Sequence, residues 1–424
     1  MKRLLNPLTN LLWFCCLIFL TSCSPLFTQE VNKSSSQTVL DTVTESELKD
    51  HIGVLAGDDM EGREAGTKGG KQAGEYVAGE FKKAQLKPVG DKETFFQNFT
   101  VHGKELRNVV GYLEGEDPQL KEEVLIIGAH YDHLGRGNFG SRDPKGQGQI
   151  HHGADDNASG VAGLLEMAKA FSRLSQEKRP KRSILFISFD GEEMGTLGSN
   201  YYIQKPLFPL TNTVFMLNLD EIGRSEGGKV MVFGLASSPS FKKSLEQCNK
   251  EIGLTCEDWK SVGQSDNMVF YQQKIPYLFF WTGYSKEMHT PADVSDKINA
   301  PVLAQITELA FLFARQLAEQ KERPKFTPLS GTTDQKPAGP FLGIAPSQEE
   351  SKTGLIVESV VPDSGAHKAG IQKGDIITEL DGEKVSNFED LRKAVSTRKT
   401  GDTIKIKILR EGKEQILDVT LGKR

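Results

Sequence analysis

The stretch Val124-Leu125-Ile126-Ile127-Gly128-Ala129-His130-Tyr131-Asp132 decides the fold of the largest part of this chain. It is a short, continuous apolar run that passes directly into a histidine and an acidic residue. Two later runs have the same form, since Ser183–Ile187 leads to Asp190-Gly191-Glu192-Glu193 and Val214–Leu217 leads to Asp220-Glu221. Continuous apolar runs are typical of strands that helices cover on both faces. The expected fold class is therefore α/β, with a mixed and largely parallel sheet flanked by helices.

Helical patterns alternate with these strands, as such a sheet requires. Apolar residues recur at helical spacing in 68–86, 161–174 and 302–317, and we predict a helix over each range. The alternation runs from about residue 45 to residue 322. We expect residues 45–322 to form one domain.

Length and composition set the rest of the organisation. A chain of 424 residues exceeds what one hydrophobic core usually organises, and 37% hydrophobic with 26% charged residues is typical of a globular protein. The formal net charge of −5 removes the usual electrostatic reason for a nucleic-acid partner. The proline-rich range 323–340 is expected to be a linker, and residues 341–424 a second, small domain.

Acidic residues and histidines follow the predicted strands at the point where each strand ends. In open α/β sheets these ends meet at one edge, where ligands bind. Asp155-Asp156-Asn157 precedes a predicted helix, and His289 follows another apolar strand that ends near Trp281. Convergent carboxylates need a cation to remain ionised together. A mixture of imidazole and carboxylate suits zinc, and five such groups can hold two ions that share one bridging carboxylate.

At this point the chain resembles a known family, the co-catalytic di-zinc aminopeptidases, whose relatives include leucyl aminopeptidases, glutamate carboxypeptidase and glutaminyl cyclase. The resemblance spans about Leu48 to Leu317, opens with the segment 55–63 (Leu-Ala-Gly-Asp-Asp-Met-Glu-Gly-Arg), and follows every metal motif in order. It implies a zinc-exopeptidase fold and two Zn²⁺ ions. By resemblance, the metal ligands are His130 and Asp220 for one ion, Glu193 and His289 for the other, and Asp156 as the bridge. Glu192 resembles the general base, and Asp132 the carboxylate that fixes the tautomer of His130.

The expected activity is that of a zinc-dependent aminopeptidase, a metallo-exopeptidase that removes N-terminal residues from peptides. Metal ions lower the pKa of water, and Glu192 would take its proton and pass it to the leaving amine. Alternatives remain open: glutaminyl cyclase or carboxypeptidase chemistry in the same cleft, or an inactive peptide-binding scaffold. Cyclases of this fold typically hold one zinc ion. The number of zinc ions bound per chain would therefore distinguish a cyclase from a two-zinc aminopeptidase.

Several residues near these motifs receive no role from the resemblance. We expect His133, His151 and His152 to be solvent-exposed or hydrogen-bonded loop histidines rather than ligands. Ser265-Asp266-Asn267 departs from the Ser-Asp-His pattern of relatives, which leaves the role of Asp266 open. Trp281 and Tyr284 are candidates to shape a side-chain pocket, although core packing is the commoner role for a tryptophan.

Residues 341–424 have the pattern of a small β-rich domain, with short apolar runs at 355–357 and strict alternation at 403–408. Phe341-Leu342-Gly343-Ile344 and the later segments 361–366 and 369–377 resemble a PDZ domain of the type found in bacterial proteases. The resemblance implies that the loop formed by Phe341, Leu342, Gly343 and Ile344 captures a C-terminal carboxylate while a strand edge pairs with the peptide. The alternative is a structural cap that binds no peptide. Ser386-Asn387-Phe388-Glu389 fits a capping box, and we predict a helix from there through about Ser396.

The N-terminus has the pattern of an export signal. Lys2 and Arg3 precede an apolar run from Leu11 to Leu20, which is too short to span a bilayer. Leu20-Thr21-Ser22-Cys23 resembles a bacterial lipobox, which implies a signal peptide over 1–22, lipidation of Cys23 and a flexible tether over 23–44. Ser24 favours the outer membrane of a Gram-negative cell envelope. The alternative is an ordinary secretory signal with a chance cysteine.

Cysteine usage is compatible with an exported protein. If residues 1–22 are removed and Cys23 is lipidated, Cys248 and Cys256 are the remaining pair. In an oxidising compartment they would form a short disulfide loop, and the alternative is two free, buried thiols.

Overall fold

The computed structural model describes residues 43–101, 103–138, 140–175, 178–329, 340–346, 351, 353–361, 363–386, 390–391, 394–395 and 397–423. The predicted signal peptide, Cys23 and the tether up to residue 42 lie outside the described residues. So do residues 330–339 of the predicted linker and part of the helix predicted from Ser386 to Ser396. Within the described ranges, no helix combines the length and apolar character that crossing a membrane demands.

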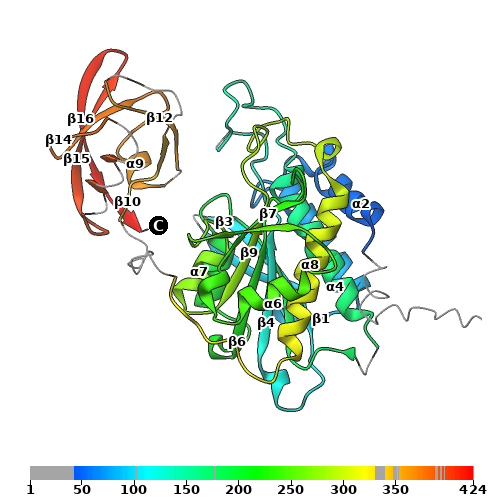
Figure 1. Cartoon of the computed structure of the whole chain (residues 1–424). Coiled ribbons are helices and arrows are strands. Elements are labelled where there is room, and N and C mark those ends of the chain that lie inside the picture. The colour runs from blue at the N-terminus through cyan, green and yellow to red at the C-terminus, as the bar shows by residue number, and fades with distance from the viewer. Residues whose placement is uncertain are drawn as a thin grey trace, which may run out of the picture.

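The larger part of the structure is built on one sheet (Figure 1). Its strands are β1 (Lys87–Pro88), β2 (Phe96–Val101), β3 (Lys104–Leu113), β4 (Val124–His130), β5 (Ser183–Phe189), β6 (Thr213–Leu219), β7 (Lys229–Phe233), β8 (Thr255–Trp259) and β9 (Tyr277–Trp281). Their order is β1-β3-β5-β4-β6-β9-β7-β8, with β2 beside β3. The neighbours β5-β4-β6-β9 run parallel, whereas β3 and β7 pair antiparallel to the two sides of this parallel core. The predicted mixed, largely parallel sheet is confirmed.

Helices lie on both faces of this sheet. They are α2 (Glu45–Leu55), α3 (Lys68–Lys83), α4 (Gly160–Ser172), α5 (Leu197–Gln204), α6 (Phe241–Cys248), α7 (Asn267–Gln272) and α8 (Ala300–Glu319). In α3 the Thr67 side chain caps the first turn by accepting the N–H of Gly70, and Val77 and Phe81 lie buried four residues apart. The three predicted helices are confirmed by α3, α4 and α8, and their ends agree within three residues.

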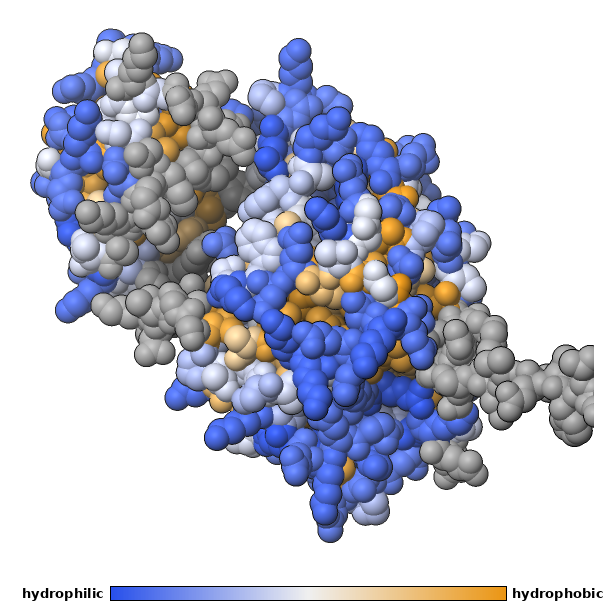
Figure 2. Space-filling view, in the orientation of Figure 1, coloured by the Kyte–Doolittle hydropathy of each residue, from blue (hydrophilic) through white to orange (hydrophobic). Residues whose placement is uncertain are grey.

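The core is divided between the two faces of the sheet. Leu125 and Ile127 of β4 join the cluster under α2, α3, α4 and α8, whereas Ile126 joins the opposite cluster, which includes Phe270 of α7. Alternate residues of one strand point to opposite faces, so a strand covered on both sides must be apolar at every position. The face of the molecule in Figure 2 is mostly hydrophilic, in keeping with apolar side chains gathered inside.

The C-terminal part is a separate, β-rich unit, coloured orange to red in Figure 1. It contains β10 (Pro340–Phe341), β11 (Ile344–Pro346), β12 (Leu355–Val360), α9 (Gly365–Lys368), β13 (Ile376–Leu380), β14 (Glu383–Lys384), β15 (Thr403–Arg410), β16 (Lys413–Thr420) and β17 (Gly422–Lys423). The main sheet has the order β11-β12-β13-β15-β16, with β14 beside β13. Ile404, Ile406 and Ile408 of β15 lie in its core, as the alternating pattern predicts.

Candidate metal centre

The predicted ligands come from the carboxyl edge of the parallel core. His130 is the last residue of β4, Asp220 follows β6 directly, and Glu192 and Glu193 follow β5 after a short turn. Because β4 lies between β5 and β6 and runs parallel to both, these residues emerge at the same edge of the sheet. Asp156 is buried in the turn that leads into α4. The topology therefore brings together residues that are far apart in the sequence.

His130, Asp156 and Asp220 form the first group. His130 Nε2 lies 3.4 Å from Asp156 Oδ1 and 3.2 Å from Asp220 Oδ1. All three side chains are buried, and their ligand atoms lie within 4.8 Å of one another.

A second group surrounds the other oxygen of Asp156. His289 Nε2 lies 2.9 Å from Asp156 Oδ2 and 3.4 Å from Glu193 Oε2. A further residue, His133, places Nδ1 2.7 Å from Glu193 Oε1 and 3.8 Å from Asp156 Oδ2. Asp156 thus presents one carboxylate oxygen to each group, which is the geometry required of a bridging ligand.

The average separation in each group is close to the spacing of two ligands on one zinc ion. Zinc binds nitrogen and oxygen ligands at about 2.0–2.2 Å in a tetrahedron, so two of its ligand atoms lie about 3.3–3.6 Å apart. The two separations of the first group are 3.2 and 3.4 Å, and the four of the second range from 2.7 to 3.8 Å.

The electrostatics of the centre also favour cations. Burial, reinforced by the charge of Asp156, raises the pKa of Glu193 to about 8. Burial also opposes ionisation of Asp156, but His133, His130 and His289 hold its pKa well below the ordinary value. The centre therefore concentrates more negative charge than the nearby imidazoles neutralise, and a divalent ion would relieve the repulsion.

Asp132 has a different set of contacts from the one expected. Its carboxylate accepts the backbone N–H groups of Glu192, at 3.0 Å, and Glu193, at 3.3 Å. The Nδ1 atom of His130 lies 3.2 Å from the backbone carbonyl of Asp132 and 3.7 Å from its carboxylate. The carbonyl is thus the nearer acceptor for fixing the His130 tautomer. The carboxylate mainly positions the two glutamates.

Glu192, the expected general base, lies partly buried beside both groups and belongs to neither. Burial raises the pKa of Glu192 well above its usual range, and the carboxylates of Asp266 and Asp220 add to the effect against the opposing influence of His130. A carboxylate close to metal ligands but outside the ligand set is the arrangement that general-base catalysis requires.

Three supporting residues were not assigned from the sequence. Ser265 Oγ donates a 2.7 Å hydrogen bond to Asp220 Oδ2 and accepts one of 2.8 Å from Asn218. Asp293 accepts the backbone N–H groups of Asp155 and Asp156. The Ser-Asp-Asn motif had drawn attention to Ser265, but the position of Asp293, four residues after His289, carries no comparable signal.

Asp266 lies buried beside the first group, and neither of its carboxylate oxygens has a clear hydrogen-bond partner among the described residues. Burial raises its pKa to about 7. Next to it, Asn267 donates its side-chain amide to the carbonyl of Val262 and has a structural role.

Arg63 explains why the opening segment 55–63 accompanies the metal motifs. Its guanidinium is fully buried and donates to five backbone carbonyls, those of Leu55, Tyr131, His152, Gly153 and Asp156. These carbonyls belong to the opening segment, the end of β4 and the loop that carries Asp156. Arg63 therefore ties three segments together directly behind the metal centre.

Replacing Arg63 by methionine is expected to lower the free energy of unfolding by at least about 3 kcal/mol, because buried carbonyls left without donors cost about 1–3 kcal/mol each. Arg63→Lys should recover only part of the loss, since an ammonium group cannot reproduce the planar fork. Chemical denaturation of the two variants measures both values. A loss below 1 kcal/mol for Arg63→Met would contradict this role.

The remaining sequence expectations have mixed outcomes. His151 is buried and lies 2.7 Å from Ser141 Oγ, and His152 Nδ1 lies 3.0 Å from the Ala56 carbonyl, so both are hydrogen-bonded loop histidines. Trp281 is half-buried, and its indole N–H donates to Glu221. Tyr284 is 78% exposed and packs edge-on against Trp281.

Cys248 and Cys256 are free thiols, as in the second of the two alternatives left open by the sequence, but both are half-buried rather than buried. Burial raises the pKa of each to about 11.

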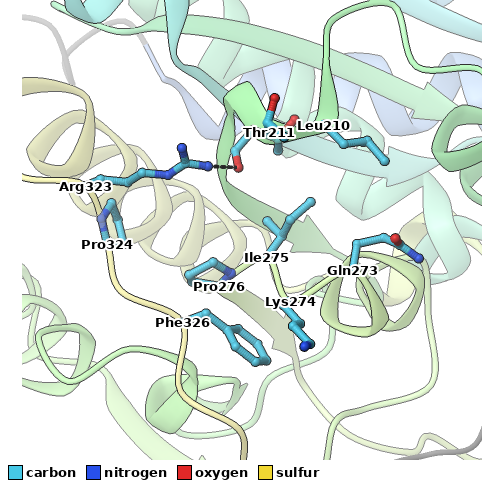
Figure 3. Close-up of a pocket in the computed structure, with 10 residues that line it drawn as sticks. Leu210, Thr211, Gln273, Lys274, Ile275, Pro276, Arg323, Pro324 and Phe326 are labelled. Carbon is cyan, nitrogen blue, oxygen red and sulfur yellow. Dashed lines mark hydrogen bonds between the residues drawn. The ribbon is translucent and has the colours of Figure 1, made fainter.

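A cavity of about 390 Å³ lies elsewhere in the same domain (Figure 3). Thr213 at the start of β6 and Pro276 just before β9 contribute to its wall, and Arg323 donates to the Thr213 carbonyl. The cavity is therefore at the amino ends of these parallel strands, whereas the metal groups are at the carboxyl ends. It is separate from the metal centre.

The loop expected to bind peptide in the C-terminal part joins β10 to β11. Leu342 is buried in the core, and Gly343 has a left-handed backbone (φ 90°) that brings it against Ser364. The Gly343 carbonyl accepts the N–H of Val361, and β11 is an edge strand of the described sheet. An edge strand after such a loop is the arrangement used for peptide addition.

Comparisons with known proteins identify both parts of the chain. Residues 108–314 match the model of peptidase family M28, and residues 340–421 match that of the PDZ domain. Aminopeptidase YwaD of Bacillus subtilis is 25% identical over 229 residues, which cover 52% of this chain and 46% of that protein. The chain spans about half the length of the curated relatives that it matches.

Solved structures share the fold at low sequence identity. BSAP, a zinc aminopeptidase from Bacillus subtilis, is 17% identical with a TM-score of 0.53, over 66% of this chain and 97% of that one. Glutaminyl cyclase from Porphyromonas gingivalis is 19% identical with a TM-score of 0.54, over 64% of this chain and 98% of that one. The fold class is thus that of the zinc exopeptidases. Residues 108–314 thus form a domain of the peptidase family M28 type, and a PDZ domain follows it at residues 340–421.

Proposed function

We propose that this protein is a zinc-dependent aminopeptidase that uses two zinc ions. The observation that carries the proposal is the position of Asp156, whose two oxygens face two separate groups of imidazole and carboxylate ligands. His130 and Asp220 would hold one ion, and Glu193 and His289 the other. When bound, the ions supply Lewis acidity that lowers the pKa of water and polarises the substrate carbonyl.

The protein's own residues would then handle the proton. Glu192 accepts it from the attacking water and delivers it to the leaving amine. Asp132 keeps Glu192 and Glu193 in register by binding both backbone N–H groups, so that the base and a metal ligand stay correctly spaced. The carboxylates around the centre would attract the free α-amine of a peptide, which favours attack at the first peptide bond.

A library of free-amine aminoacyl peptides, assayed with and without a chelator, tests this proposal. The proposal is supported if N-terminal residues are released, if the chelator abolishes this release, and if added zinc restores it. The protein should also bind two zinc ions per chain. N-terminal glutaminyl peptides included in the library report on the cyclase alternative, and Nα-blocked dipeptides on carboxypeptidase action. Zinc-loaded protein that cleaves none of these peptides while its PDZ domain binds them would favour the scaffold alternative.

Metal removal should also lower thermal stability. Ligand at 100–1000 times its Kd stabilises a protein by about 3–4 kcal/mol, and each kcal/mol moves the Tm of a domain of this size by about 2–4 °C. Zinc should therefore raise the Tm of chelator-treated protein by about 5–15 °C in differential scanning calorimetry, whereas Mg²⁺, which prefers oxygen ligands, should raise it much less. No response to zinc would contradict the metal centre.

We propose that the PDZ domain binds peptides that end in a free carboxylate and recruits them or a partner protein. Its support is the loop at Gly343 beside the edge strand β11. A Cβ atom at position 343 would collide with Ser364, and the left-handed backbone disfavours any side chain there. Gly343→Val should therefore abolish peptide binding in a fluorescence titration.

Peptides with an amidated C-terminus should also fail to bind to the wild-type protein. Binding of such peptides would contradict capture of the terminal carboxylate.

We also propose that the protein is lipid-anchored through Cys23 in a bacterial cell envelope, at the outer membrane. The support is the basic, apolar and small-residue pattern of residues 1–23. Membrane fractionation and mass spectrometry of the mature N-terminus test it. Cys23→Ala should release the protein from the membrane fraction.

A further inference from the structure

His133 lies in the metal centre, although no motif assigned it a role there. Its Nδ1 atom lies 2.7 Å from Glu193 Oε1 and 3.8 Å from Asp156 Oδ2, and its ring centroid is 5.8 Å from that of His289. The ligand atoms of His133, Asp156 and Glu193 lie within 4.8 Å of one another. His133 is thus as close to the second group as His289, the residue that the family resemblance assigns to it.

The four nitrogen-to-oxygen distances in the second group can be compared with those expected around a single zinc ion. From Nδ1 of His133 and Nε2 of His289 to the oxygens of Glu193 and Asp156 they are 2.7, 3.8, 3.4 and 2.9 Å. Their mean is close to the spacing of about 3.3 Å expected between two ligands of one tetrahedral zinc ion. Removing His133 would leave only three protein ligands.

The fold fixes the His133 ring in this place. The backbone N–H of His133 donates to the Arg63 carbonyl, and the side chain is fully buried. Gly153 packs closely against the ring, since a Cβ atom there would stand 2.5 Å from His133 Cδ2. The ring therefore has one position, which points Nδ1 at Glu193 and Asp156.

The second ring nitrogen is available to carry the proton. His133 Nε2 is buried and has no hydrogen-bond partner among the described residues. Among the described residues, the atoms that face Nδ1 are carboxylate oxygens of Glu193 and Asp156, so binding of a cation at Nδ1 would place the ring proton on Nε2. A cation between these groups would take the lone pair of Nδ1.

We propose that His133 is a direct ligand of the second metal ion, in addition to Glu193, His289 and the bridging Asp156. This inference rests on the proposed two-metal function. It assigns the second ion four protein ligands, two imidazoles and two carboxylates, whereas the first ion has three. The second ion is accordingly held at least as firmly as the first.

The first test measures metal affinity without any substrate. Zinc content after dialysis and competition with a chromophoric chelator should give two ions for the wild-type protein. His133→Ala should retain one tight ion and bind the second more than 100-fold more weakly, beyond the loss of about 10–100-fold that an outer partner of a ligand produces. His289→Ala is the positive control and should show a loss of the same kind. His151→Gln, at a buried histidine of the same loop that bonds Ser141, is the matched control and should keep both ions.

The second test separates ligation from a hydrogen bond to Glu193. In ¹⁵N-histidine-labelled protein loaded with ¹¹³Cd, Nδ1 of His133, identified by its absence in the His133→Gln spectrum, should show one-bond coupling to the metal and no attached proton. An attached proton without coupling would overturn the proposal and leave His133 a positioning residue. Unchanged second-ion affinity in His133→Ala would overturn it as well.

These measurements are independent of turnover. If the wild-type protein binds two ions through His133 but cleaves no aminoacyl peptide, the proposed function fails and the ligand assignment stands. If it cleaves peptides but His133→Ala keeps both ions at wild-type affinity, the assignment fails alone. A wild-type protein that binds a single ion would refute both.

Discussion

Glu192→Gln is expected to reduce kcat for aminoacyl peptides by about 10²–10⁴-fold, the contribution that a positioned general base usually makes. Glutamine has nearly the same shape as glutamate but cannot accept a proton. Because Glu192 is not a member of either ligand group, the variant should still hold two zinc ions. Its backbone N–H, which binds Asp132, is also unchanged.

The measurement is steady-state kinetics combined with zinc analysis of the same samples. Glu226→Gln, at an exposed residue on the loop before β7, is the matched control and should keep wild-type activity. Near-normal turnover in Glu192→Gln would refute its role as the base. Loss of zinc from this variant would show instead that Glu192 belongs to the ligand set.

The second large effect is expected at Asp156. Asp156→Asn removes one of the two anionic oxygens that face the two groups and leaves His130, His133 and His289 without the carboxylate that they share. The amide group would direct N–H donors towards one of the cations. Both ions should therefore bind poorly, and activity should fall to that of chelator-treated protein.

Calorimetry supplies a reading of this variant that does not depend on catalysis. The rise in Tm that zinc produces in the wild-type protein should be absent in Asp156→Asn. Asp296→Asn, at an exposed aspartate in the same domain, should show the full rise. A zinc-dependent increase of wild-type size in Asp156→Asn would contradict the bridging role.

The sheet and most of the centre could be predicted because both depend on local pattern. β4, β5 and β6 are buried on both faces, so each is apolar along its length, and the first polar residues after it mark the edge of the sheet. His130 and Asp220 lie at such edges, whereas the choice of Glu193 among the acidic residues after β5 came from the family resemblance. The alternation of Ile404, Ile406 and Ile408 likewise indicates a strand with one buried face.

Residues placed by contacts between distant segments could not be predicted in the same way. His133 enters the centre because its backbone pairs with the opening segment, at Arg63 and Glu64, rather than continuing a loop towards solvent. Asp293 reaches the turn of Asp155 and Asp156 from the other end of the domain. Neither contact leaves a periodic pattern or a characteristic spacing in the sequence from which it could be predicted. Asp132 was identified from its motif. Its main partners are the backbone N–H groups of Glu192 and Glu193, and such contacts cannot be predicted from a pattern of side chains.

The five carbonyl bonds of Arg63 have a consequence for how the protein can be shortened or inactivated. Arg63 lies well before residues 108–314, the segment that matches the peptidase family. A protein trimmed to that segment would keep all the predicted zinc ligands and lose the cation that joins their loops. Removal of the chain up to and including Arg63 is therefore expected to weaken zinc binding, although every predicted ligand remains. A shortened protein should therefore retain both Arg63 and α2, whose last residue, Leu55, supplies one of the five carbonyls.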